Sequence, residues 1–568
     1  MAAEIELRDL SIVLYKNGMR ETFPVMRASL SYRVGLPPAV QVTISAANLF
    51  NTPTPEERAF RELFEDSPDG TIGALILGLN VVYPDKPSNA PTKTICLFSG
   101  YVSGLGSSLV ASTHTIQSSI TFQLVTGLMG INALPGGLFR VFSVGGGDAT
   151  GMLPKPYQVY LQGRQAAANI LEKLKARFVE NPADCILHLI DHLRDNSVNI
   201  SGLSVAECFD TSNIKLKLKA KPVNGEVVHI FATKLAQGLV GAPASAVALS
   251  ALQELFLTPI PQTIIKDWTK EDGEPVLSKM IVRPSVSGWN KIPKSRVFGV
   301  QLDARHLLGI SDTTQFRLDQ RVDFWFVVKG VSEKDNAQKF AAIYAPGYGE
   351  NGEAEFLNTE EFRTQVAKTA VPNARALIGR MVVLPWWMER VLVSSTPPAQ
   401  NKEKSKEEDS DSPKPVGGAQ RPQQPENTDD ATWEDACKRI AVLSFLENGC
   451  AVNGLSLKLP LGVTLNMLPW LGDTISVASY TPADTINRTE PPKNWEESVR
   501  TRYGLLDGIS MTFELNYKEL QVTCGATLSQ VHDEDLHDEL AADNPLYASG
   551  PEYCYNSEAV EVLEEAWE

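Results

Sequence analysis

The chain has 568 residues and a mass of 62.1 kDa, with 43% hydrophobic and 21% charged residues. This composition is typical of globular proteins, excludes a disulfide-stapled miniprotein or a wholly disordered chain, and leaves room for three or four domains of about 150 residues. The net charge is −16, of which twelve negative charges fall in residues 531–568, so the body is nearly neutral and gives no support for a basic nucleic-acid groove.

The cysteine count and the first residues bear on the compartment. None of the seven cysteines occurs in a CxxC pair, and their odd, scattered count favours free thiols and synthesis in a reducing compartment. The opening MAAEIELRDL carries no basic and apolar signal pattern. The most apolar stretch, residues 73–83, is about half of a membrane span. We therefore expect no membrane-spanning segment.

Residues 1–150 are predicted to consist mainly of β-strands. Apolar and polar residues alternate over 28–34, 40–44 and 120–124, and a period of two buries one face of a strand. Asn17-Gly18 predicts a tight turn. Several short strands with turns between them favour a small antiparallel barrel or sandwich.

Residues 151–258 are predicted to form a helical domain. An amphipathic stripe spans 158–178, and Asn181-Pro182 supplies an N-cap and a first-turn proline for a helix over 181–194. A third helix is expected over 244–256, opened by Pro243.

The remaining chain returns to strands and polar segments. In the β-rich domain 259–394, residues 322–328 become apolar on both faces, as in a central strand. Residues 395–432 are rich in Pro, Lys, Glu, Asp, Gln and Ser and predict a disordered linker. Residues 433–530 predict a helix over 433–446 and strands that complete a second barrel-like domain, with alternation over 455–459, 509–515 and 520–524. Residues 531–568 form an acidic tail.

The fold class expected is therefore mixed β and α. Two mainly antiparallel, barrel-like domains are joined by a helical segment, and the two β regions are candidates for related barrels. No short internal repeat is evident in the sequence.

The histidines of the predicted helix 181–194 are the first candidate metal ligands. His188 and His192 lie four residues apart and share a helix face with Asp184, while Asp191 lies nearby. Zinc can bind histidines at this spacing, but no glutamate directly follows His188, as an HExxH site requires, and no third ligand is evident. A structural or solvated role is favoured.

The other candidate sites lack the spacing that chemistry requires. The acidic segment around His532 and His537 has neither the ligand order nor the glycine of an EF-hand, so a solvated acidic segment is favoured there. The glycine-rich runs 145–148 and 347–349 do not continue as phosphate-binding loops. Trp386-Trp387 favours a core or interface anchor over a sugar platform, and Glu407-Glu408 falls in the linker. We expect no catalytic, cofactor-binding or metal residues, and no enzyme.

The order of the segments resembles the hub proteins of tailed-phage tails and baseplates. The run ICLFSGYVSGLGSSL, from Ile95 to Leu109, and the strand region from His114 to Leu134 resemble the first barrel of that family. The helix-like segment 433–449, the strand and turn region 455–477, and the closing strands 504–531 resemble its C-terminal part. The family's Pro-Gly turn is replaced here by Pro469-Trp470-Leu471-Gly472, and the linker and acidic tail are additions.

The resemblance implies a structural virion protein made in the host cytoplasm. In that family two barrel-like domains per subunit alternate around a homotrimer, giving a pseudo-sixfold ring that joins the tail tube to a central spike around the DNA exit channel. The implied partners are the tube protein, the spike and other baseplate proteins, without sequence-specific nucleic-acid binding. The alternatives are another baseplate adaptor or tube-capping component and, less favoured, a cell-wall-degrading enzyme.

Overall fold

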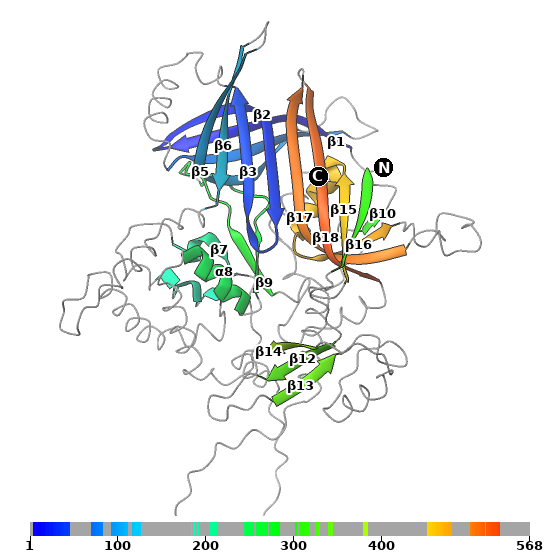
Figure 1. Ribbon diagram of the computed structural model, residues 1–568. Coiled ribbons are helices and arrows are strands. Elements are labelled where there is room, and N and C mark those ends of the chain that lie inside the picture. The colour runs from blue at the N-terminus through cyan, green and yellow to red at the C-terminus, as the bar shows by residue number, and fades with distance from the viewer. Residues whose placement is uncertain are drawn as a thin grey trace, which may run out of the picture.

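The computed structural model describes the chain in separate stretches, drawn as coloured ribbon in Figure 1. These are residues 4–45, 70–82, 92–111, 116–126, 183–184, 186–188, 190–191, 204–212, 244–254, 257–270, 272–284, 301–303, 307–316, 324–329, 339–344, 379–383, 451–479, 500–516 and 519–533.

Six N-terminal strands form a closed circuit of antiparallel pairs, which we call the first unit. They are β1 (Glu4–Lys16), β2 (Met19–Arg33), β3 (Leu36–Ser45), β4 (Ile72–Val82), β5 (Thr92–Ala111) and β6 (Ile116–Val125). The order is β1-β4-β5-β6-β3-β2, and β2 pairs again with β1. The expected turn joins β1 to β2. Asn17 and Gly18 have φ values of 49° and 82°, and a type I′ turn requires positive φ at both central residues.

A second set of strands follows an open path, and we call it the second unit. Its order is β10-β16-β17-β18-β15-β11. The strands are β10 (Gln301–Asp303), β11 (Gly309–Phe316), β15 (Ala451–Leu459), β16 (Thr474–Ser479), β17 (Arg500–Asn516) and β18 (Glu519–Asp533). Strands from residues 301–316 therefore pair with strands after residue 450. The helix α12 (Leu461–Met467) and the 3-10 turn η6 (Leu468–Trp470) lie between β15 and β16.

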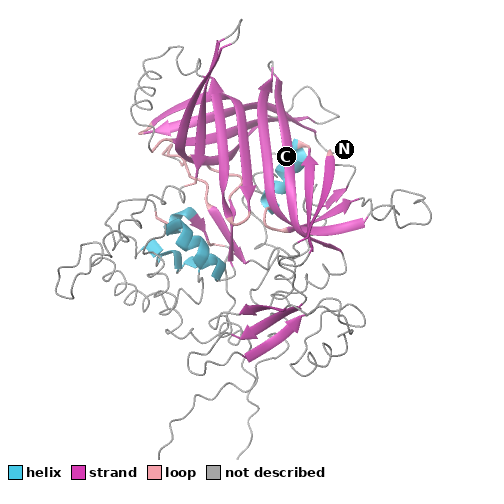
Figure 2. Ribbon diagram, in the orientation of Figure 1, coloured by secondary structure: helices cyan, strands magenta, loops and turns pink. Residues whose placement is uncertain are grey.

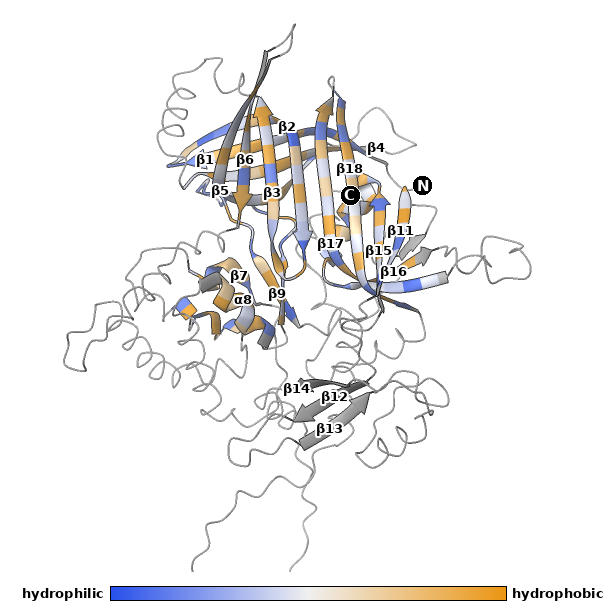
Figure 3. Ribbon diagram, viewed as in Figure 1, coloured by the Kyte–Doolittle hydropathy of each residue, from blue (hydrophilic) through white to orange (hydrophobic). Residues whose placement is uncertain are grey.

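The two units form one continuous sheet. β17 pairs antiparallel with β2, with partners running from Arg27 and Glu514 to Arg33 and Gly508. Apolar residues alternate with polar ones along both strands (Figure 3), and one hydrophobic core contains residues of both units. In this joint Phe513 faces Ala28, and both are fully buried. We call the β2–β17 pairing the in-chain joint.

A chain segment from the middle of the sequence binds both units. It comprises β8 (Leu257–Pro261), β9 (Met280–Pro284) and the residues between them, and β9 also pairs with the short strand β7 (Phe209–Asp210). Toward the first unit, the Ile265 amide donates to the Cys96 carbonyl at 3.0 Å. Toward the second unit, the Thr263 hydroxyl donates to the Leu468 carbonyl at 3.2 Å. The segment therefore ties the units together beside the in-chain joint.

The remaining described elements are small. A three-stranded sheet has the order β13-β12-β14, formed by β12 (Phe324–Lys329), β13 (Lys339–Tyr344) and β14 (Gly379–Val383). β12 is central, which confirms the prediction made from its apolar faces. The helix α8 (Ala244–Glu254) confirms the third expected helix, and η2 (Ala206–Cys208) is a single 3-10 turn.

The described chain is mostly antiparallel β-sheet, and helices are a minor part of it (Figure 2). The expected helical domain 151–258 thus contributes α8, η2 and helical residues among 183–191, together with β7 and the start of β8. Helix α12 differs from the sequence prediction, which gives residues 455–477 as a strand and turn region. The predicted helices over 158–178 and 433–446 and the linker 395–432 lie outside the described residues.

The strand registers show that the two units repeat the same plan. In the first unit β5 carries a bulge between Val102 and Gly104, opposite Leu124 and Gln123. In the second unit β17 carries a bulge between Leu506 and Gly508, opposite Leu528 and Thr527. Superposing these bulges aligns GYVSGLGSSLVA (100–111) with GLLDGISMTFEL (504–515).

The repeat extends to the strand that precedes each of these. β4 starts opposite Tyr101 and β16 starts opposite Leu505, which are equivalent positions. Each of the two strands follows a glycine with positive φ, Gly70 at 76° and Gly472 at 87°. The strands β4, β5, β6, β3 and β2 of the first unit therefore correspond to β16, β17, β18, β15 and β11 of the second.

Candidate functional site: two open strand edges

The outer half of β5 has an open edge. β4 pairs with β5 only as far as Tyr101, and from Val102 to Ala111 the described partner of β5 is β6 alone. The resulting hairpin stands out from the first unit at the top of Figure 1. Leu105 and Leu109 are 50% and 68% exposed, and residues 102–111 include no charged side chain.

β11 has the second open edge, at the other end of the continuous sheet. It pairs with β15 through residues 309–316, and no other described strand pairs with it. Residues 310–315 are all exposed, and Leu308 and Ile310 are 71% and 37% exposed. Arg502 donates to Asp312 at 2.7 Å, which fixes β11 against the start of β17.

Open edges of this kind are unusual in an isolated protein. A strand edge presents unpaired backbone amides and carbonyls, and natural proteins usually protect it with charges, proline, bulges or a covering segment. Beyond Gly104 the β5 edge has neither charge nor proline. Eight strands, β5-β6-β3-β2-β17-β18-β15-β11, lie between the two edges in one sheet. This arrangement suits the addition of strands from another molecule at each end.

A buried ion pair stabilises the second unit near the in-chain joint. Arg283 on β9 donates to Asp473 at 2.7 Å, and both side chains are 2% exposed. Burial raises the pKa of the Asp473 carboxyl above its usual value, although the positive charge of Arg283 and its hydrogen bond act in the opposite direction. Arg283 also reaches the Pro469 carbonyl at 3.4 Å. The pair connects β9 to the turn that precedes β16 and so holds these two elements together.

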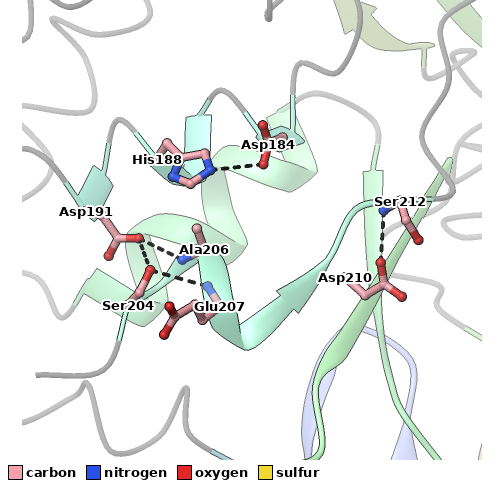
Figure 4. Close-up of polar contacts among 8 residues, drawn as sticks. All are labelled: Asp184, His188, Asp191, Ser204, Ala206, Glu207, Asp210 and Ser212. Atoms are coloured by element: carbon pink, nitrogen blue, oxygen red, sulfur yellow. Dashed lines mark hydrogen bonds and ion pairs between the residues drawn. The ribbon is translucent and has the colours of Figure 1, made fainter.

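The histidine cluster predicted from the sequence forms local structural contacts (Figure 4). His188 Nε2 lies 3.2 Å from Asp184 Oδ1, whereas His192 lies outside the described residues. Asp191 accepts three hydrogen bonds, from the Ser204 hydroxyl at 2.6 Å and from the Val205 and Ala206 amides at 2.6 and 2.8 Å. Its carboxylate therefore stabilises the start of η2. Within the described residues, no group of three or more His, Cys, Asp or Glu could hold a metal ion.

The expectation of a solvated acidic segment is wrong for its first residues. Residues 531–533 continue β18, and His532 is buried, with its Nδ1 2.6 Å from the Gln530 carbonyl and its ring stacked on Tyr503. The predicted site positions that lie outside the described residues are His537, the glycine runs 145–148 and 347–349, Trp386-Trp387 and Glu407-Glu408. No described helix is long and apolar enough to cross a membrane.

Sequence reasoning missed the residues of the two open edges. The alternation in 105–109 predicts a strand but does not show which of its edges lacks a partner. One signal was present: the segments 100–111 and 504–515 have matching Gly-x-x-x-Gly spacing, and each is followed by an Ile-Gln or Leu-Gln pair near the start of the return strand. Comparing the two runs with each other would have indicated the repeat.

Comparison with known proteins gives matches among solved structures. No family model matches the chain, and no curated protein matches it. A tail protein from Neisseria meningitidis MC58 is 10% identical, with a TM-score of 0.35, over 94% of this chain and 99% of the other. The 43 kDa tail protein of prophage MuSo2 from Shewanella oneidensis is 8% identical, with a TM-score of 0.34, over 94% and 99%.

A third match comes from a secretion system. An E. coli component of the type VI secretion system, itself structurally similar to bacteriophage T4 tail proteins, is 9% identical over 97% of this chain and 80% of the other, with a TM-score of 0.32. These proteins are of the class that the sequence resemblance names, the tail proteins of phages and related systems.

Proposed function

We propose that the protein is a structural hub of a phage tail or a related injection system. Three copies form a closed ring in which the two units of each chain alternate, giving six similar units around a central bore. The ring joins the tail tube to the central spike and surrounds the DNA exit channel. The protein acts by assembly and not by catalysis.

The observation that carries this proposal is the pair of open edges on one continuous sheet. A sheet that ends in two different open edges can pair one edge with the other edge of the next copy. Such head-to-tail addition gives a ring when the rotation between copies closes. In a closed ring the open edges of β5 and β11 are paired, so no strand edge is left exposed to unwanted pairing. The repeat of the strand plan within the chain supports six similar positions from three copies.

The charge of the chain fits a bore that conducts DNA. The body of the chain is nearly neutral, because most of the net charge of −16 falls in residues 531–568. A basic lining would hold the phosphates of passing DNA, whereas a neutral one would not.

The experiment is the mass of the purified full-length protein by multi-angle light scattering, followed by class averages in negative stain. We expect a species with three times the chain mass of 62.1 kDa and a ring with an open centre. A stable monomer at high concentration would contradict the proposal. A ring with another copy number would favour a baseplate adaptor or tube cap.

A further inference from the structure

The in-chain joint supplies a template for contacts between copies. There the free edge of β17 pairs with β2, and the registers place Phe513 opposite Ala28, Thr512 opposite Ser29 and Ile509 opposite Tyr32. In the repeated plan β5 corresponds to β17, and β11 corresponds to β2. The outer edge of β5 is open, whereas the equivalent edge of β17 is paired. The outer edge of β11 is open, whereas the equivalent edge of β2 is paired.

The registers define the equivalent residues. β5 aligns with β17 through the shared bulge, so Leu109 corresponds to Phe513. β11 aligns with β2 through β15 and β3, because Leu457 and Val42 lie opposite the equivalent residues Ala526 and Phe122. Their partners on the next strand, Ile310 and Ala28, are therefore equivalent.

We propose that β11 of one copy pairs antiparallel with the open edge of β5 in a second copy, in the register of the in-chain joint. This register places Leu109 opposite Ile310, Ser108 opposite Ser311, Gly106 opposite Thr313 and Leu105 opposite Thr314. The inference deepens the proposed function and rests on it, because it names the strands and the register through which the copies of the ring join.

Burial of apolar side chains supports this register. Among the described residues six large apolar side chains are exposed. Leu105, Leu109 and Ile310 lie on these two edges, and Leu308 directly precedes β11. In the in-chain joint the equivalent pair, Phe513 and Ala28, is fully buried. Pairing Leu109 with Ile310 would bury two of the exposed side chains against each other, at the place where the template buries its own pair.

The two edges also complement each other in charge and shape. Residues 104–110 of β5 carry glycine, leucine, serine and valine without charge, and β11 opposite them carries Gly309, Ser311, Thr313 and Thr314. The single acidic residue of β11, Asp312, is already bound to Arg502 of its own chain. Small side chains on both strands allow the backbones to approach closely.

Head-to-tail pairing differs in a testable way from symmetric pairing. Two β5 edges, or two β11 edges, could pair around a twofold axis and would give a closed dimer. Pairing of β5 with β11 leaves one edge of each kind at the ends of every open assembly, so copies continue to add until the ring closes.

The test is cross-linking between copies by introduced cysteines in the full-length protein. The variant Leu109→Cys/Ile310→Cys places the two thiols on directly opposed residues, within reach of a disulfide or a short bifunctional thiol reagent. The matched control is Leu109→Cys/Ser311→Cys, in which the second cysteine is also exposed but points to the other face of β11. Peptide mass spectrometry identifies the joined residues and separates them from the native cysteines.

We expect the first variant to give covalent multimers joined through residues 109 and 310, and the control to give at least tenfold less. Cross-links in Leu109→Cys alone would show β5–β5 pairing and overturn the inference. A ring that forms by light scattering without a link between residues 109 and 310 would also overturn it, while leaving the proposed function in place. A protein that stays monomeric would overturn both.

Discussion

The two units share a strand plan but close it differently. In the first unit β1 pairs with both β2 and β4, so the circuit of strands is complete. In the second unit the corresponding path ends at β10, which pairs parallel with β16, and at β11, which pairs with β15 alone among the described strands. The described part of the second unit therefore depends on other contacts for stability, namely the β8–β9 segment, helix α12 and the joint with β2.

The two units also differ in the polar groups that lie in their cores. At the position where the second unit has Asp473, bound to the buried Arg283, the first unit has Thr71, whose buried hydroxyl has no hydrogen-bond partner among the described residues. Equivalent backbone contacts surround both: the Val102 amide donates to the Thr71 carbonyl and the Leu506 amide donates to the Asp473 carbonyl. At this position the second unit therefore carries a buried ion pair, whereas the first unit carries an uncharged threonine.

The largest expected effect follows from breaking that ion pair. Asp473→Ala leaves a buried guanidinium without its carboxylate and should lower the free energy of unfolding by about 3–5 kcal/mol. The measurement is the midpoint of urea unfolding of the full-length protein. The matched change in the first unit, Thr71→Val, removes an unsatisfied hydroxyl and should be neutral or slightly stabilising. Similar losses for both variants would contradict the comparison.

The in-chain joint and the proposed joint between copies can be compared by truncating equivalent side chains. Phe513→Ala removes a fully buried ring and should cost about 3–5 kcal/mol of stability. Leu109→Ala changes a side chain that is mostly exposed in the single chain, so the free energy of unfolding of the dilute, dissociated protein should stay within about 0.5 kcal/mol of the parent. The same variant should weaken self-association, measured by sedimentation at decreasing protein concentration. Unchanged self-association would argue against a role for β5 in the ring.

The two equivalent glycines should differ in their tolerance of a side chain. Gly70 has φ +76° and open space where a Cβ would lie, so Gly70→Ala should cost about 1–2 kcal/mol from backbone strain alone. Gly472 has φ +87°, and a Cβ there would collide with Ile260 of the β8–β9 segment. Overpacking adds about 1–3 kcal/mol, so Gly472→Ala should melt at the lower temperature. Equal melting temperatures would show that Ile260 moves aside freely.

The smallest expected effect is a pH dependence at the bulge of β17. Burial raises the pKa of the Asp507 carboxyl above its ordinary value of 3.8, against the hydrogen bond from Thr527 and the charge of Arg33. The folded state therefore holds a proton that the unfolded state has lost, and stability falls as the pH rises from about 4 through the raised pKa. Asp507→Ser installs the residue of the equivalent first-unit position, Ser103, and should flatten this part of the stability profile. An unchanged slope from pH 4 upward would assign the effect to another group.

Strand positions could be predicted from the sequence, because alternation of apolar residues is a local signal. The pattern of residues 28–32 and 509–513 matches buried positions in β2 and β17, and Asn17-Gly18 forms the expected turn. The pairing of β2 with β17 could not be predicted in this way, since a strand's period says which face is buried and not which strand lies beside it.

The candidate site consists of strand edges that have no partner among the described strands. The sequence did not indicate it, because a strand's period does not show whether another strand lies beside it. Leu105 and Leu109 have the period expected of a buried face, yet they are exposed because β4 ends its pairing at Tyr101. Helix α12 was missed for a related reason: Val463, Leu465 and Met467 alternate as in a strand, but contacts with the core favour a helix.

The placement of the histidine candidate on a helix was within reach of the sequence. The four-residue spacing of Asp184 and His188 predicts a shared helix face, and the 3.2 Å contact between their side chains confirms it. The contacts of Asp191 could not be predicted in this way, because its partners Ser204, Val205 and Ala206 belong to a segment beyond the helix.

The in-chain joint also sets an order of events during synthesis. β2 is made near the start of the chain, but its outer edge pairs Arg33 with Gly508, far along the sequence. At about 5–20 residues per second a ribosome needs roughly half a minute to one and a half minutes to make the intervening chain. During that time the first unit can close its own circuit while the β2 edge stays open. The growing polypeptide is thus exposed to strand pairing with neighbouring nascent chains, and binding of a chaperone to β2 would be of most use in that interval.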